Sequence, residues 1–299
     1  MSILEIIPSL IGYLMCILAI IHAIKASDNL LQRLVMLFSL FLYGFLLELM
    51  GVISGNYDYA EELIMLLGII PLSVTLAWVG IIYSVMVIAE SLNLTAWQRI
   101  IMATLIALSL DWGMDPIAVD LGAWTWNFEG GSYFGIPSFN FIGWFFIPIA
   151  YLTSYGIFWD RQNKHLKLLT IKEVEERDSI GRKLYSVLGV VPISMGILLL
   201  VGIVTRIPFL YNLPLIIVII WVVLTVVIAT VVISWKYKSL KLTKWFDIIP
   251  SIILMVIEIN YTIYGFLAGR FDLAIIMILT GIPLWLIFIF TLVNNRTLK

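Results

Sequence analysis

Residues 111–144 read DWGMDPIAVDLGAWTWNFEGGSYFGIPSFNFIGW and place carboxyl groups in an otherwise apolar segment. Asp111 and Asp115 are four residues apart, so on a helix they share one face. Pro116 lacks a backbone donor and restricts the residue before it, which predicts a kink or a helix end at this point. The following residues, 121–139, are rich in aromatic side chains and glycine and contain no Lys or Arg. Carboxyl groups beside such a loop indicate a binding or catalytic site.

Composition predicts an integral membrane protein built of helices. Hydrophobic residues make up 62% of the 299 residues and charged residues only 12%, whereas soluble domains are about a quarter charged. We therefore expect an all-α, multi-pass bundle in the cell membrane, without a nucleic-acid partner. Cys16 is the only cysteine, and His22 and His165 are the only histidines. These counts exclude a disulfide within the chain and argue against a Cys- or His-based metal site.

Apolar segments long enough to cross a bilayer, about 20 residues, occur nine times. The first lacks the basic start and cleavage site of a signal peptide, so we expect it to be retained. The third contains Pro71 and is expected to be kinked or tilted. We expect one membrane domain over residues 1–299, with a charged cytoplasmic linker at about 160–182. The predicted spans are 3–25, 32–53, 62–90, 98–119, 138–158, 183–204, 213–235, 245–268 and 272–293.

Basic residues predict the orientation of these spans. Of the 18 Lys and Arg residues, all but Arg206 and Arg270 fall in the C-terminal tail or in alternate loops, those after the first, third, fifth and seventh spans. Basic residues are enriched on the cytoplasmic side of membrane proteins. The pattern therefore predicts nine spans, with the N-terminus outside and the C-terminus inside.

Four carboxyl groups are predicted inside the membrane: Glu48, Asp111, Asp115 and Glu258. With the orientation above, they all lie in the outer half of the bilayer, and no Lys or Arg is expected at that depth. Ionisable groups inside a membrane are costly and usually functional. A carboxylic acid kept neutral by an apolar pocket can act as a general acid. The alternative is that each acid makes an interhelical hydrogen bond that only holds the bundle together.

Aromatic residues near these carboxyls have alternative interpretations. Tyr57 and Tyr59 are more typical of the aromatic belt at a membrane interface than of a site. Trp78 either lines a pocket or packs in the core. We find no phosphate-binding glycine loop, no nucleophile elbow and no redox motif.

The central segment resembles a family of carotenoid-biosynthesis membrane proteins. This family includes archaeal bisanhydrobacterioruberin hydratases and bacterial carotenoid hydratases of the CruF type. The resemblance extends to FLLELMGVISGNYDY, which contains Glu48, Gly51, Gly55, Tyr57 and Tyr59, and to PLSVTLAW, with Pro71 and Trp78. In the central motif it rests on Asp111, Asp115, Pro116, Gly122, Trp124, Trp126, Gly131, Tyr133, Phe134, Gly135, Ile136, Pro137, Asn140, Phe141, Gly143 and Trp144.

The resemblance implies cofactor-independent addition of water to a terminal C=C bond of a long polyprenoid, giving a tertiary alcohol. The partners would be a carotenoid-like isoprenoid in the bilayer and surrounding lipid. As a hypothesis, Asp115 or Asp111 donates the proton and Glu48 orients water, although these roles could be reversed. Glu258 is a further catalytic candidate. The candidate substrate-binding residues are Trp78, Trp124, Trp126, Tyr133, Phe134, Asn140 and Trp144.

Three other functions are compatible with intramembrane carboxyls. A prenyltransferase of the UbiA type has Asp-rich motifs, but this chain has one such motif and no nearby Lys or Arg to hold diphosphate. A non-redox carotenoid cyclase shares the protonation step and differs in what captures the cation. A proton-coupled transporter would use the carboxyls as relays. The mass of the product separates hydration, cyclisation, prenyl transfer and transport.

Overall fold

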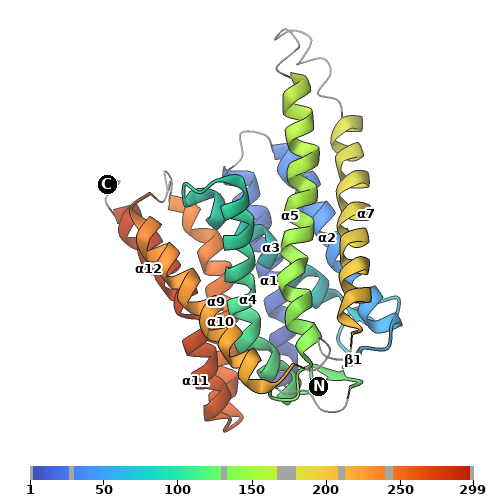
Figure 1. Cartoon of the computed structure of the whole chain (residues 1–299), viewed down its shortest axis with the longest axis vertical. Helices are drawn as coiled ribbons and strands as arrows, with labels where there is room; N and C mark the ends of the chain where they lie inside the picture. The colour runs from blue at the N-terminus through green and yellow to red at the C-terminus, as the bar shows by residue number, and fades with distance from the viewer. Residues whose placement is uncertain are drawn as a thin grey trace.

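A computed structural model describes residues 3–26, 30–128, 133–166, 180–207, 213–239 and 245–296. They form a bundle of long helices with two short β-ribbons at one end (Figure 1). The strands are β1 (Tyr57–Tyr59) paired with β4 (Trp124–Trp126), and β2 (Met65–Leu66) paired with β3 (Ile70–Pro71), both antiparallel. The helices are α1 (Ile3–Ala26), α2 (Leu30–Ile53), α3 (Leu72–Ser91), α4 (Ala96–Asp120), α5 (Ser138–Leu166), α7 (Ile180–Thr205), α9 (Leu215–Lys236), α10 (Ile249–Leu267), α11 (Phe271–Thr280) and α12 (Ile282–Arg296), with short 3-10 helices at Tyr237–Ser239 and Trp245–Ile248.

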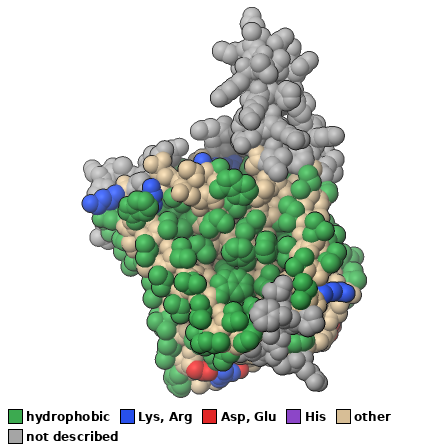
Figure 2. All heavy atoms as spheres, in the orientation of Figure 1, with side chains coloured by type: hydrophobic (Ala, Val, Ile, Leu, Met, Phe, Trp, Pro, Cys, Tyr) green, Lys and Arg blue, Asp and Glu red, His purple; other side chains and the backbone are tan. Residues whose placement is uncertain are grey.

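The helices have the length and composition of membrane spans. Among the described residues, five are long and apolar enough to cross a bilayer, and a sixth span results if α11 and α12 are counted as one bent segment. Apolar side chains cover the visible flank of the bundle, and charged ones lie toward its margins (Figure 2). These observations confirm the predicted all-helical, multi-span architecture. The count of nine spans and the orientation stay predictions.

The bundle is layered around α3 and α4. The most apolar window of α4 is 89% buried and that of α3 is 72% buried, whereas that of α9 is only 22% buried. The central helices therefore contact other helices on nearly all sides, and α9 presents most of its surface to the surroundings. Asp111 and Asp115 of α4 are consequently deep inside the protein, and not at its lipid-facing edge.

The structure corrects the predicted span 62–90 and the helix end predicted as one alternative at Pro116. The segment 62–90 is not one kinked helix, because α3 begins at Leu72 and the β2–β3 hairpin occupies the residues before it. Pro71 precedes the helix with φ −61°, where its missing N–H costs nothing. Pro116 does not end α4, which continues to Asp120. The proline leaves the carbonyl of Trp112 without its helical donor, and the Tyr133 hydroxyl donates to that oxygen at 3.0 Å.

Two further predictions concern the ends of spans. The ninth predicted span, 272–293, is divided at Gly281 into α11 and α12, which meet at an angle of 51°. Most of the predicted cytoplasmic linker, 160–182, lies outside the described residues. The part that is described belongs to α5, which continues to Leu166, and to α7, which begins at Ile180.

Candidate active site

The β1–β4 ribbon carries four inward-facing aromatic side chains. Tyr57 lies opposite Trp126 and Tyr59 opposite Trp124, with ring centroids 5.0 and 6.1 Å apart. Alternate residues of a strand point to opposite faces, so the residues between these pairs are exposed while the aromatic residues face the bundle. The ribbon thereby covers one end of the space between the helices with aromatic rings.

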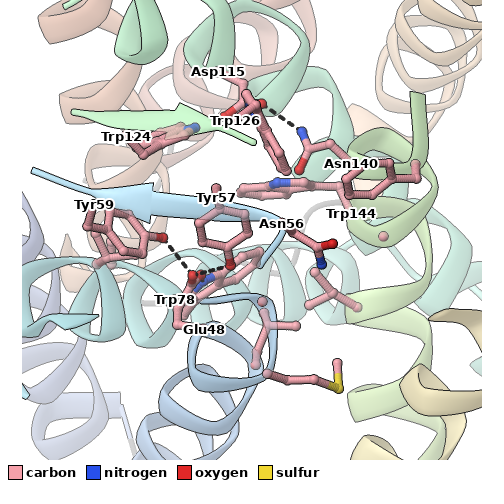
Figure 3. Close-up of a pocket in the computed structure, with 18 of the residues that line it drawn as sticks. Glu48, Asn56, Tyr57, Tyr59, Trp78, Asp115, Trp124, Trp126, Asn140 and Trp144 are labelled. Atoms are coloured by element: carbon pink, nitrogen blue, oxygen red, sulfur yellow. Dashed lines mark hydrogen bonds between the residues drawn. The ribbon is translucent and has the colours of Figure 1, made fainter. Parts of the chain in front are cut away.

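Glu48 of α2 is held by three hydrogen-bond donors. The hydroxyls of Tyr57 and Tyr59 both donate to its Oε2 at 2.6 Å, and the Trp78 indole N–H donates to Oε1 at 2.5 Å (Figure 3). The side chain is buried, with 4% of its surface exposed. Donors from a strand and from α3 therefore converge on one carboxyl group from α2, and they stabilise a negative charge on it.

The two tyrosines are suited to remain donors. Burial first, and then the negative charge of Glu48, raises the pKa of each hydroxyl in the ribbon well above its ordinary value. Both phenols therefore stay protonated at neutral pH and through the ordinary alkaline range. This keeps two O–H groups directed at one carboxylate oxygen.

Asp111 and Asp115 form a pair of neighbouring carboxyl groups, whose hydrogen-bond partner differs from those of Glu48. Asn140 of α5 donates from Nδ2 to Asp115 Oδ2 at 2.7 Å and, at 3.4 Å, to Asp111 Oδ2. Both carboxyls are almost completely buried, and Asp111 Oδ1 has no hydrogen-bond partner among the described residues. One amide thus serves two neighbouring acids, a poor arrangement for two negative charges.

A cavity of about 1230 Å³ connects Glu48 with the Asp111–Asp115 pair. Its wall is formed by α1, α2, α3, α4, α5, α7, α10 and the β1–β4 ribbon. Glu48 and Asp115 both line it, and they are close enough to interact electrostatically. Figure 3 shows Asp115 with Asn140 on one side of the pocket and Glu48 with its tyrosines on another. Trp78 and Trp144 pack together with ring centroids 4.4 Å apart and also line the wall.

The structure brings most of the predicted site residues together, but not all. Asp111 lies behind the wall, joined to it through Asn140. Tyr133 packs on Trp112 and supports the proline-containing part of α4. Phe134 is 42% exposed and is not part of the wall. The predicted residues that line the cavity are Glu48, Trp78, Asp115, Trp124, Trp126, Asn140 and Trp144.

Glu258 occupies a different place from the other three acids. It is buried on α10 and packs against Gly281, where an added methyl group would collide with its carboxyl. Gly281 is the point at which α11 and α12 diverge. Glu258 therefore contacts the bend in the last helical segment, and the cavity wall does not include it.

Sequence reasoning missed several polar residues of the cavity. Tyr57 and Tyr59 donate hydrogen bonds to Glu48, whereas their sequence context favours the aromatic belt of a membrane interface. The alternation in YDY and WTW was a signal for two short strands with aromatic residues on one face. Glu62, which accepts a hydrogen bond from Ser73 at 2.6 Å, and Arg206 also line the cavity. No local pattern marks either residue, because they reach the cavity only through tertiary packing.

Together, the helices and this buried polar cavity define a polytopic membrane protein with an acid-rich internal site. The profile of a protein family described as carotenoid biosynthesis protein matches residues 8–219. The chain belongs to this carotenoid biosynthesis family. The matched region contains Glu48, Asp111, Asp115 and both strands of the ribbon, whereas Glu258 lies beyond it. Comparisons with curated proteins and with solved structures gave no match.

Proposed function

We propose that the protein is a cofactor-independent hydratase, a hydro-lyase that adds water to a terminal C=C bond of a long carotenoid-like polyprenoid. One observation carries this proposal: two differently bonded carboxyl groups, Asp115 and Glu48, face the same aromatic-lined cavity inside an apolar bundle. Hydration of an alkene requires a proton donor and a proton acceptor at one reaction centre. The family supports a role in carotenoid biosynthesis.

Asp115 is the better proton donor of the two. Its Oδ2 accepts the Asn140 amide, which leaves Oδ1 to carry a proton beside the cavity. Two ionised carboxylates sharing one amide donor in a buried space would repel each other, so the pair formed with Asp111 favours retaining a proton. A neutral carboxylic acid in an apolar site is a strong enough donor to act as a general acid.

Glu48 is the better proton acceptor. All three of its donors approach carboxylate oxygens, and the indole N–H of Trp78 can only donate. This arrangement favours a carboxylate that orients a water molecule and takes its proton. The acid and base roles thus follow from the partners of each carboxyl, since both side chains are buried to a similar extent.

The reaction balances without a cofactor. Proton transfer from Asp115 to the less substituted alkene carbon produces a tertiary carbocation. The faces of Trp126 and Trp124 stabilise positive charge through their π electrons. Water forms a C–O bond to the cationic carbon and loses a proton to Glu48. Passage of that proton back to Asp115 restores the starting state, and the product is a tertiary alcohol.

We further propose that the chain crosses the cell membrane nine times with the N-terminus outside. The start of α1 and the end of α12 lie at opposite ends of the bundle (Figure 1), as an odd number of crossings requires. This orientation directs the β1–β4 ribbon outward. The cavity then lies in the outer half of the bilayer, where an apolar isoprenoid would reach it from the lipid.

The test is mass spectrometry of membrane lipids from a host that makes lycopene or bisanhydrobacterioruberin, with and without this protein. We expect a product heavier by one or two waters, absent when Asp115→Asn is expressed at an equal level. An isomer of unchanged mass would instead identify a cyclase, and a product heavier by a prenyl group would identify a prenyltransferase. An unchanged lipid profile with well-expressed protein would overturn the assignment of chemistry and favour transport.

A further inference from the structure

The wall of the cavity along α7 is incomplete toward the ribbon end of the bundle. Two stripes of this helix line the cavity: Leu198, Gly202 and Thr205, and beside them Leu199, Ile203 and Arg206. Leu198 and Thr205 of the first stripe face the bundle, since they are 4% and 8% exposed. In the second, Leu199 is 53% and Ile203 67% exposed. The same side chains therefore border both the cavity and the surroundings of the bundle.

The other end of the same helices is closed. Tyr43 of α2 donates to the carbonyl of Ile147 on α5 at 2.9 Å, and the Ser39 and Tyr151 hydroxyls lie 2.5 Å apart. On α7, Ser194 donates to the carbonyl of Ala150 at 3.3 Å. These contacts join α2, α5 and α7 away from the ribbon. Along α7, the opening therefore lies near the C-terminal end of the helix.

Two glycines keep the opening free of side chains. Gly143 of α5 and Gly202 of α7 both line the cavity, and a Cβ added at either would meet no atom within 4 Å. These glycines are therefore not required for close helix packing. Each instead borders open space, in contrast to Gly12 and Gly113, where an added Cβ would collide with a neighbouring helix.

The surroundings of the opening are apolar. Leu200 and Val204, the next residues around α7, are 66% and 52% exposed. Arg206 lies one helical turn beyond Gly202, about 6 Å along the axis, and is the first charged residue toward that end of α7. The long side chain of an arginine near the end of a span extends to the membrane interface. The opening thus faces the hydrocarbon just below the headgroup level.

We infer that this opening, bordered by Gly143, Leu199, Gly202 and Ile203, is a lateral portal that binds the trailing chain of a long acyclic prenyl substrate. The inference rests on the proposed function for the identity of the substrate. The reacting end occupies the cavity while the remaining chain passes through the portal into the bilayer. Substrate length is then not limited by the cavity, and each binding event admits one end of the molecule.

The test is photolabelling of the full-length protein in liposomes. The probe is an acyclic polyprene hydrocarbon that carries a diazirine near its midpoint, and labelled residues are mapped by mass spectrometry. We expect labelling of Leu199 and Ile203 to exceed that of Leu200 and Val204, which are equally exposed to lipid but do not line the cavity. Equal labelling of the two pairs would overturn the portal.

Glycine variants provide a second test of the portal. A leucine at position 202 fills the opening, so Gly202→Leu should lower labelling of Ile203 about tenfold. Gly143→Leu blocks it from the opposite helix and should do the same. Gly196→Leu is the matched control, because Gly196 also borders open space on α7 but does not line the cavity. Unchanged labelling in both blocked variants would overturn the portal.

Photolabelling does not require catalytic turnover. The portal and the proposed hydratase activity are therefore tested independently. Wild-type protein that is labelled at the portal but forms no hydrated product would overturn the hydratase assignment alone. Protein that forms hydrated product without selective labelling of Leu199 and Ile203 would overturn the portal alone.

Discussion

Asp115 and Glu48 are both buried acids on apolar helices, and their different partners separate their roles. Asp115 has one amide donor, which it shares with Asp111, whereas Glu48 has three donors of its own. Hydrogen bonds to a charged group contribute about 1.5–3 kcal/mol each. The three donors of Glu48 therefore favour its carboxylate much more than the shared amide favours a second charge near Asp115.

Replacing Asp115 by Asn should remove the proton donor, and replacing Asp111 by Asn should remove the neighbouring acid that favours its protonation. Both changes keep the side-chain volume. We expect each change to lower turnover by about 10²–10⁴-fold, the usual contribution of general acid catalysis, with the amount of folded protein unchanged. Asp120→Asn is the control on the same helix, because Asp120 pairs with Arg270 at the partly exposed end of α4. The measurement is hydrated product formed per folded enzyme. Full activity in both buried variants would contradict the acid assignment.

The donors of Glu48 can be removed one at a time without losing an aromatic ring. Tyr57→Phe and Tyr59→Phe should each have a modest effect, because the other hydroxyl still donates to Oε2. The double variant should lose more than the sum of the two losses, expressed as free energies of activation. Tyr13→Phe is a suitable control, since the Tyr13 hydroxyl has no hydrogen-bond partner in the described part of the chain. Additive losses measured as kcat/KM would argue against shared support of Glu48.

At the scale of elements, the β1–β4 ribbon and α2 depend on each other. Each strand has only three residues, and a two-stranded ribbon is at best marginally stable in isolation. Its tyrosines are anchored on Glu48, and Tyr57 also packs against Gly51, one turn of α2 away from that acid. The ribbon therefore takes its position from the same helix whose carboxyl it supports.

Gly51→Ala should disturb this element without changing any polar group. An added methyl would collide with the ring and hydroxyl of Tyr57, so the tyrosine must move away from Glu48. We expect a loss of turnover at least as large as that of Tyr57→Phe. Gly196→Ala is the control, because a methyl group there meets open space. Hydration assays on both variants decide the matter, and wild-type activity in Gly51→Ala would show that the Tyr57 contact is dispensable.

At the scale of the whole molecule, the orientation in the membrane determines on which side of the bilayer the β1–β4 ribbon covers the site. Thr125 is exposed on β4, and Lys238 is exposed after α9. In a Cys16→Ser background, Thr125→Cys should react with a membrane-impermeant maleimide added to intact cells. Lys238→Cys should react only after permeabilisation, because basic loops are retained in the cytoplasm. The reverse pattern would invert the orientation, and labelling of both from one side would contradict the three spans predicted between these two positions.

The architecture could be predicted from sequence because a bilayer imposes strong local constraints. Each helix must satisfy its own backbone hydrogen bonds in lipid, so apolar segments of sufficient length mark the helices before any tertiary contact is known. The same constraint makes a buried acid conspicuous, which is why Glu48, Asp111 and Asp115 could be selected. The aromatic residues Trp124 and Trp126 could be selected because they lie in the same short segment.

Only the tertiary structure decided which of these groups meet. Glu258 has the same local signature as Glu48, yet it packs at the bend beside Gly281 while Glu48 faces the cavity. The helical periodicity of a sequence gives the face of a residue, but the neighbour of that face depends on how all the helices pack. The continuation of α4 through Pro116 likewise depends on Tyr133, 17 residues further along the chain, which supplies the donor for the free Trp112 carbonyl. Sequence alone therefore determined a helical membrane protein with buried acids, and packing determined the site.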